Sequence, residues 1–214
     1  DKAGNSGGAT ESGINIDKTD PNVAVSGVQD GAEYVLGSAP VPSCAASDEL
    51  SGLVAAAHLA VEGGSVNGVG TFTATCSATD LAGNSAGAAK TYQVVYGGLS
   101  GILQPINADG SSLFSRGRAV PVKFRLDGDP LPSGFASVDW QLQRVLVSCE
   151  TETEYSSENV GSVTPSTTFR YDATADQYVY NADFRDKAAG TCWKVRVTLD
   201  SGQVLDSAKF KLQR

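Results

Sequence analysis

The stretch GTFTATCSATDLAGNSAGAAKTYQVVY, residues 70–96, decides how the rest of the chain is interpreted. Small or polar residues alternate with apolar ones over residues 71–75, which is the period-two pattern of a half-buried strand. The segment DLAGN at residues 80–84 supplies turn chemistry, because Asp and Asn bond nearby backbone and glycine accepts a positive φ. Residues 91–96 predict the returning strand. The stretch is therefore expected to form an antiparallel hairpin with Cys76 in its first strand.

The first five residues, DKAGN, repeat the turn DLAGN with an offset of 79 positions, residue 1 against residue 80. Residues 1–16 are therefore expected to be the last turn and strand of a preceding repeat, or an N-terminal extension. Because the sequence contains no methionine, we expect a portion of a longer precursor. A lone strand is not stable in water. Residues 10–16 should thus pair with their own domain, pair with another copy of the chain by strand addition, or continue a preceding part of the protein. The alternative is a loosely ordered tail.

Length and composition favour β structure in two domains. The chain has 214 residues, of which 24 are glycine, and this length fits one large domain or two of about 100 residues. A polar linker that ends at Pro21 and a glycine-rich junction at residues 97–101 place the domains at 17–97 and 98–214. Turn signals about every ten residues then predict an all-β chain of two tandem immunoglobulin-like β-sandwich domains.

The expected strands follow from alternation and from the turn signals between them. The run LVAAAHLA at residues 53–60 fits either a strand or a helical turn, and its short length with flanking glycines favours the strand. In the second domain, Cys192 and Trp193 are neighbours in one strand, so both are buried only if both strand faces are covered. The strands are expected at 22–28, 33–36, 42–46, 53–59, 70–79 and 88–96, and then at 101–105, 119–126, 138–147, 162–171, 177–183, 192–199 and 203–212.

Charge and hydropathy exclude two classes of partner. The formal net charge is −8 and the isoelectric point is about 4.6, whereas nucleic-acid binding needs clustered Lys and Arg. No apolar run approaches the roughly 18 residues that span a bilayer. We therefore expect no nucleic-acid partner and no membrane-spanning segment.

The four cysteines are Cys44, Cys76, Cys149 and Cys192, and none belongs to a CxxC pair. The single histidine, His58, has no partner, so a zinc site is not expected. An even number of widely spaced cysteines in a β-rich chain indicates two disulfides and an oxidising compartment. Because a domain boundary separates the second cysteine from the third, we expect one disulfide in each domain, Cys44–Cys76 and Cys149–Cys192. The alternative is four buried reduced thiols.

The first domain resembles the bacterial immunoglobulin-like and hyalin-repeat (HYR-like) modules of secreted and surface proteins. The segments that carry the resemblance are FTATC at 72–76, ATDLAGN at 78–84 and YQVVY at 92–96. The resemblance implies a β-sandwich and export from the cell.

The second domain is similar to the PxKF-type module at the C-terminus of actinobacterial exported proteins. The segment AVPVKF at 119–124 carries the motif, and YDATADQYVY at 171–180, AGTC at 189–192 and AKFKL at 208–212 support it. This resemblance also implies a β-sandwich in a secreted or cell-surface protein, and neither resemblance carries over a catalytic residue.

The sequence offers no set of catalytic residues. His58 lies in an alanine-rich apolar run, and no GxSxG, HExxH or phosphate-binding glycine loop occurs. The carboxylates of Glu150, Glu152 and Glu154 alternate and would share one strand face. A solvated sheet edge is the favoured interpretation of this cluster over glycoside hydrolysis. We therefore expect that the chain is not an enzyme.

Calcium is the one cofactor for which the sequence offers ligands. Asp1 and Asn5 of the first turn could meet Asp17 and Asp20 of the linker, and carboxylate, amide and carbonyl oxygens are the ligands that calcium prefers. The alternative role of these four residues is turn formation and capping. Asp80 and Asn84 of the turn at 80–84 could repeat this arrangement at the second junction, but Tyr96 stands there in the position of Asp17, which argues against a second site.

Three tyrosines are candidate ligand-binding residues, because exposed aromatic rings form platforms for carbohydrates. Tyr178 and Tyr180 share a strand face, and Tyr171 lies within reach across a hairpin. The alternative is cross-strand packing that stabilises the sheet.

These observations lead to two functional hypotheses. The first is a non-catalytic structural or adhesive module of the extracellular surface, which assembles into a filament or surface layer through residues 10–16. The second is a carbohydrate-binding accessory region of a secreted hydrolase, with cell-surface polysaccharide as the partner.

Overall fold

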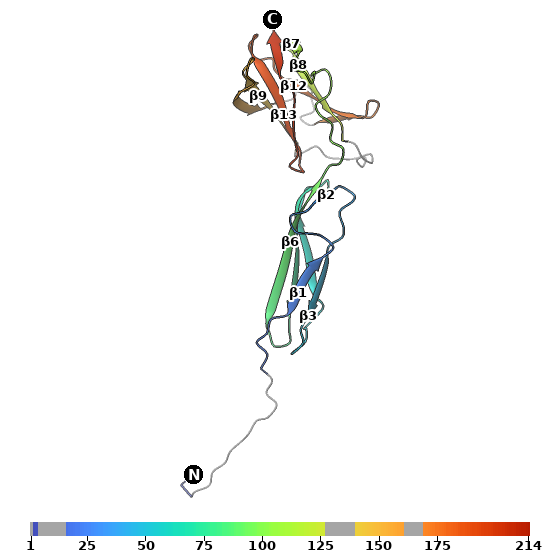
Figure 1. The fold of residues 1–214 in the computed structure, drawn as a ribbon, viewed down its shortest axis with the longest axis vertical. Helices are drawn as coiled ribbons and strands as arrows, with labels where there is room; N and C mark the ends of the chain where they lie inside the picture. The colour runs from blue at the N-terminus through green and yellow to red at the C-terminus, as the bar shows by residue number, and fades with distance from the viewer. Residues whose placement is uncertain (1, 4–15, 127–139, 161–168) are drawn as a thin grey trace. The chain divides into compact units, whose positions relative to one another are not determined.

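The computed structural model describes residues 2–3, 16–126, 140–160 and 169–214. Within these ranges the regular elements are fifteen β-strands, β1 to β15 (Figure 1), and there is no apolar helix of membrane-spanning length. The fold is all-β, with two tandem immunoglobulin-like β-sandwiches that carry one disulfide each, as the sequence predicts. Asp1, Asn5, residues 10–15 and most of the strand expected at 162–171 lie outside the described residues.

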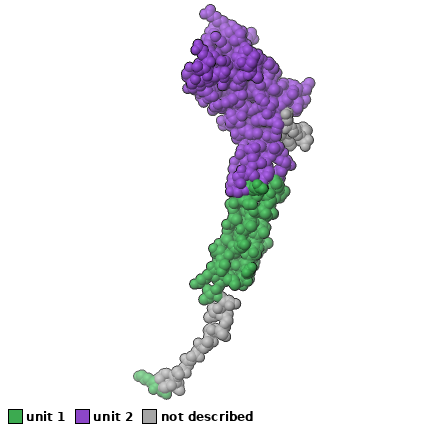
Figure 2. Space-filling view, in the orientation of Figure 1, with its two compact units in different colours: residues 1–29, 40–61, 73–90 green, residues 30–39, 62–72, 91–214 purple. Residues whose placement is uncertain are grey.

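The chain divides into two compact units (Figure 2). The first unit contains residues 1–29, 40–61 and 73–90. The second unit contains residues 30–39, 62–72 and 91–214.

Two sheets form the first sandwich. In the smaller sheet, β1 (Asn22–Ser26) and β3 (Ser43–Ser47) pair antiparallel. The larger sheet has the order β2-β6-β5-β4 and consists of β2 (Glu33–Val35), β4 (His58–Gly63), β5 (Gly70–Thr79) and β6 (Ser85–Val95). β5 has the bounds that the sequence predicts. Its alternation is also confirmed, since Ala74, Cys76 and Ala78 are buried and the residues that follow each of them are exposed.

The first disulfide joins these two sheets. Cys44 in β3 is bonded to Cys76 in β5, with 5.4 Å between the Cα atoms, and Cys76 is fully buried. The expected pairing is confirmed, and the covalent link crosses the core of the first sandwich.

A glycine is required at position 27 by both conformation and space. Gly27 follows β1 with a φ of 87°, and a Cβ atom there would collide with the carbonyl oxygen of Val41. Gly27→Ala is therefore expected to lower the free energy of unfolding by about 2–3 kcal/mol. Gly37→Ala is the matched control, because Gly37 has a φ of 83° but open space around it, and it should lose only about 1 kcal/mol. Urea unfolding measures both variants, and equal losses would contradict the steric argument.

The second sandwich lies within the second unit and also has two sheets (Figure 1). One sheet has the order β10-β9-β13-β15-β7 with β14 paired to β13, and the other has the order β11-β12-β8. Most pairs are antiparallel, but β7 runs parallel to β15. The strands are β7 (Ser112–Ser115), β8 (Ala119–Phe124), β9 (Gln141–Val147), β10 (Glu154–Asn159), β11 (Arg170–Asp172), β12 (Gln177–Asp183), β13 (Cys192–Thr198), β14 (Val204–Asp206) and β15 (Phe210–Gln213).

Both faces of β13 are covered at its first residues. Trp193 packs against the ring of Phe184 with 5.7 Å between centroids. Cys192 points to the opposite face, where it is bonded to Cys149 with a Cα separation of 5.2 Å. Trp193 and Cys192 are both buried. The second expected disulfide is thus confirmed, and it links β13 to the loop after β9.

Three expected strands differ from the structure by more than their end positions. Over residues 53–59, only Leu53 forms a bridge, to Asp80, and the strand begins at His58 instead. Residues 101–105 form no strand. The segment 203–212 divides into β14 and β15, because Ser207 turns its backbone N–H to the carbonyl of Val195 and its hydroxyl accepts the Val195 N–H.

The carboxylates of Glu150, Glu152 and Glu154 were expected to share one strand face, and the structure does not show this. Glu152 has a φ of 57° in the turn, where its carboxylate lies 2.9 Å from Lys194 Nζ. Glu154 is the first residue of β10, and its carboxylate lies 3.1 Å from Arg196 Nη2. These carboxylates are neutralised by cations of β13, which explains why like charges can lie close together here.

A half-buried carboxylate lies in the turn between β13 and β14. Asp200 Oδ1 accepts hydrogen bonds from Tyr96 Oη and Trp140 Nε1, both at 2.8 Å, and Oδ2 accepts one from Asn67 Nδ2 at 2.6 Å. Burial raises the pKa of Asp200, but hydrogen bonds from Ser65, Trp140, Tyr96 and Asn67 outweigh it and hold this pKa below its ordinary value. All of these residues belong to the second unit.

Candidate metal centre

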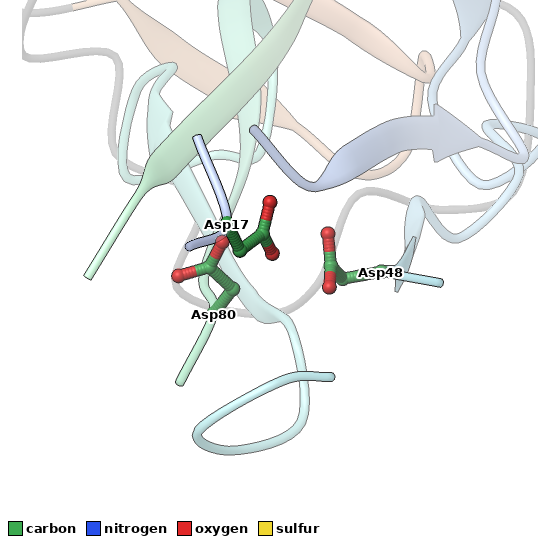
Figure 3. A group of neighbouring side chains, drawn as sticks. All are labelled: Asp17, Asp48 and Asp80. Atoms are coloured by element: carbon green, nitrogen blue, oxygen red, sulfur yellow. The ribbon is translucent and has the colours of Figure 1, made fainter. Parts of the chain in front are cut away.

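Three aspartates meet in the first unit. Asp17 precedes β1, Asp48 follows β3, and Asp80 lies in the turn between β5 and β6. One carboxylate oxygen from each lies within 4.8 Å of the other two (Figure 3). Segments far apart in the sequence therefore bring three negative charges together.

The turn of residues 80–84 fixes Asp80. Asn84 donates to both carboxylate oxygens, from its backbone N to Oδ1 and from Nδ2 to Oδ2, each at 2.7 Å. Asp80 is fully buried. Burial raises the pKa of Asp80, but the hydrogen bonds from Asn84 and from the backbone of Gly83 and Ala82 outweigh it and keep the pKa below 3.8. The carboxylate is therefore negatively charged at neutral pH.

The same asparagine holds the segment that carries Asp17. Asn84 Nδ2 lies 3.2 Å from the carbonyl oxygen of Thr19 and 3.4 Å from that of Asp17. The Asp17 carboxylate accepts the backbone N–H of Thr19 at 2.8 Å and that of Ser51 at 3.2 Å. These hydrogen bonds, that from Thr19 first, lower the pKa of Asp17.

Asp48 organises the loop after β3. Its Oδ1 accepts the backbone N–H groups of Ser51 and Gly52 at 2.8 Å and that of Leu50 at 3.1 Å. All of these hydrogen bonds are accepted by Oδ1, so Oδ2 of Asp48 takes no part in them.

The chemistry of the cluster fits a hard cation. Calcium takes six to eight oxygen ligands, including carboxylates, carbonyls and water. In the described part of the chain, none of the three carboxylates forms an ion pair with Lys or Arg. A hollow of about 340 Å³ beside Asp17 leaves space for water ligands, and it is lined by Ile16, Asp17, Leu50, Ser51, Leu81 and Ala82.

The structure bears on two of the four expected ligands. Asp17 belongs to the cluster, whereas the exposed Asp20 does not. Asp1 and Asn5 lie outside the described residues. The sequence links the turn at 80–84 only to a second junction and argues against a site there; the turn instead lies beside Asp17, because the β5–β6 hairpin turns back toward the start of β1. Asp48 was missed, since its sequence context suggests only a turn residue.

Calcium binding at Asp17 remains a prediction, now with Asp48 and Asp80 as its neighbours. At a calcium concentration of 100 times Kd, binding should raise the free energy of unfolding by about 2.7 kcal/mol. Asp48→Asn should remove most of this gain, because it removes one of the three charges. Asp20→Asn is the matched control and should keep it, since Asp20 lies nearby but outside the cluster.

Thermal unfolding in calcium and in chelator measures this gain. If the native chain unfolds at the same temperature in both, the three carboxylates serve only to form turns.

The tyrosine platform is corrected by the structure. Tyr178 and Tyr180 are only 5 % and 6 % exposed. Tyr178 stacks on Phe124 with 5.5 Å between ring centroids, and Tyr180 packs against Phe169 at 4.8 Å. Only Tyr171 of the three is exposed, and its hydroxyl donates to Asp176 at 2.6 Å. Tyr178 and Tyr180 share a face, as the sequence predicts, but this face is the core.

Comparison with known proteins finds solved structures of low similarity. No family model and no curated protein matches the chain. Extracellular cadherin domains 3–6 of protocadherin gamma B2 are 16 % identical with a TM-score of 0.28, covering 91 % of this chain and 51 % of that chain. Fibronectin(III)-like modules of Clostridium thermocellum CbhA are 10 % identical with a TM-score of 0.28, covering 90 % and 94 %. The tandem Ig repeats of Dlar are 12 % identical with a TM-score of 0.24, covering 90 % and 96 %.

The chain spans about half the length of the protocadherin fragment, and at these TM-scores the likenesses bear on no ligand or activity. The sheets and disulfides themselves define the class of protein, which is a pair of tandem immunoglobulin-like β-sandwich modules.

Proposed function

We propose that the chain is a non-catalytic structural or adhesive module of a secreted or cell-surface protein. The observation that supports this most directly is that each sandwich carries its own disulfide. Disulfides persist in oxidising compartments and stabilise small domains whose cores are modest. The HYR-like turn at 80–84 and the PxKF motif support the same proposal.

The PxKF motif at 119–124 forms β8 and contributes mainly to the core. Val120, Val122 and Phe124 are fully buried, and Pro121 lies opposite Asn181 of β12. Alternate burial along β8 shows that this segment packs the core of the second sandwich.

Assembly through residues 10–16 is the finer part of this proposal, and its test is the mass of the purified chain in solution. Light scattering of the chain with and without residues 1–16, in calcium and in chelator, gives this mass. A large species that disappears on truncation is the expected result. A monomer in every condition would overturn filament assembly and leave a spacer or adhesive module.

A carbohydrate-binding accessory region of a secreted hydrolase is the second candidate. The exposed ring of Tyr171, 46 % exposed and held by Asp176, favours it. Polysaccharide pull-down with the native chain and with Tyr171→Ala tests this role, and retention of both proteins to the same extent would exclude Tyr171 as the binding residue.

A further inference from the structure

The charges of the chain are distributed unevenly. Before residue 98 there are three Lys and no Arg against ten carboxylates, whereas residues 98–214 hold all eight Arg and five Lys against fourteen carboxylates. Although the whole chain has a negative net charge, residues 98–214 are close to neutral, so cationic side chains can cluster there.

Such a gathering lines a hollow of about 420 Å³ in the second unit. The hollow lies between the turn that joins β7 to β8 and the loop that joins β12 to β13. Three of its six lining residues are cationic, and one is acidic. They are Arg116, Gly117, Arg185, Asp186, Lys187 and Ala188.

The acidic residue of the hollow is already neutralised. The Asp186 carboxylate accepts hydrogen bonds from Nη1 and Nη2 of Arg144, at 2.7 and 2.9 Å. It also lies 3.0 Å from Lys187 Nζ. Glu158 lies 2.9 Å from Arg144 Nε and 2.6 Å from Lys187 Nζ. Two cations and two carboxylates thus balance one another in this network.

The two remaining guanidinium groups differ in how they are held. Arg185 donates from Nε and Nη2 to the two carboxylate oxygens of Asp183, at 2.9 and 2.7 Å, and its Nη1 takes no part in this pair. Arg116 is exposed, and within the described residues it forms no ion pair. Among the cations that line the hollow, Arg116 is therefore the one that forms no ion pair with a described residue.

We propose that this hollow binds a single oxyanion, a carboxylate or a phosphate, carried by a sugar unit. That this sugar belongs to an extracellular glycan rests on the proposed function. Arg116 would provide the charge and a guanidinium fork that matches oxyanion geometry, and Nη1 of Arg185 would provide a second donor. The volume lies within the range of small-molecule sites, and the charged lining favours a polar ligand over an apolar one. This site lies outside the PxKF core, and it does not depend on assembly through residues 10–16.

Calorimetric titration of the intact chain at low salt tests the proposal with three probes: galacturonate, glucose 1-phosphate and neutral galactose. Binding of either or both anionic sugars, with no binding of galactose, is the expected result. The stronger of the two shows whether the oxyanion is a carboxylate or a phosphate. Binding of galactose as tight as that of the anions, or binding of none, would overturn the proposal.

Two matched variants locate the site. Arg116→Ala should weaken binding about tenfold or more, because it removes a charge-assisted hydrogen-bond donor. Arg118→Ala removes the same charge two residues away, outside the lining of the hollow, and should leave binding within about twofold. Both residues are exposed, so both variants should keep the unfolding temperature of the native chain. Equal losses in the two variants would show a diffuse charge effect and contradict a site at Arg116.

Discussion

Replacing Cys44 and Cys76 together by alanine should lower the free energy of unfolding of the first sandwich by about 3–4 kcal/mol. The disulfide closes a loop between residues separated by 32 positions, so its removal returns conformational entropy to the unfolded chain. The alanines also leave a small gap in the core, because Cys76 is fully buried between the two sheets. Both effects act in the same direction.

Denaturant unfolding followed by circular dichroism measures this loss, and native protein in reductant, which opens both disulfides, should lose more stability than the double variant. Cys149→Ala with Cys192→Ala is the matched comparison, with a separation of 43 positions. Loop entropy alone predicts that this second pair contributes slightly more, by about 0.3 kcal/mol. A clearly larger loss for the first pair would show that joining two sheets also matters in the folded state. A loss below about 1 kcal/mol for the first pair would contradict the prediction.

Asp200→Ala is expected to lower the free energy of unfolding by about 2–4 kcal/mol. The substitution removes an ionised acceptor from hydrogen bonds with Tyr96, Trp140 and Asn67, and hydrogen bonds to charged groups are stronger than neutral ones. Asp200→Asn keeps the shape and one acceptor oxygen but loses the charge, so its loss should be smaller. If the two variants lose the same amount, the charge of Asp200 contributes nothing.

The same residue gives stability a dependence on pH. The pKa of Asp200 in the folded chain lies below its ordinary value of 3.8. Its contribution is therefore complete above the unfolded-state pKa and is lost as the pH falls through the folded-state pKa. The native chain should lose more stability than Asp200→Asn between about pH 5 and about pH 2. Urea midpoints at a series of pH values measure this, and parallel curves would contradict it.

Alternation along single strands was the most reliable guide to this fold. The sequence predicts β5 and β12 with the bounds that the structure shows. Apolar residues alternate strictly in β5, whereas β12 contains three adjacent buried residues, Tyr178, Val179 and Tyr180. Both disulfide pairs also follow from the sequence. Alternation predicts which residues share a strand face but not what covers that face. The prediction that Tyr178 and Tyr180 share a face is therefore confirmed, whereas the prediction that they are exposed is wrong.

Arrangements between distant segments were beyond the sequence. Asp48 joins Asp17 and Asp80 only because loops from three parts of the chain converge at one place, and no local pattern encodes that convergence. The parallel pairing of β7 with β15 was missed for the same reason. The hollow around Arg116 likewise combines two loops that are separated by most of the second sandwich.

The position of β15 determines when the second sandwich can fold. This strand lies between β13 and β7 in its sheet, and Phe210 and Leu212 are fully buried in the core. A nascent chain that ends before residue 210 has no strand to which β7 can pair, so this sheet is completed only after residues 210–213 have been synthesised.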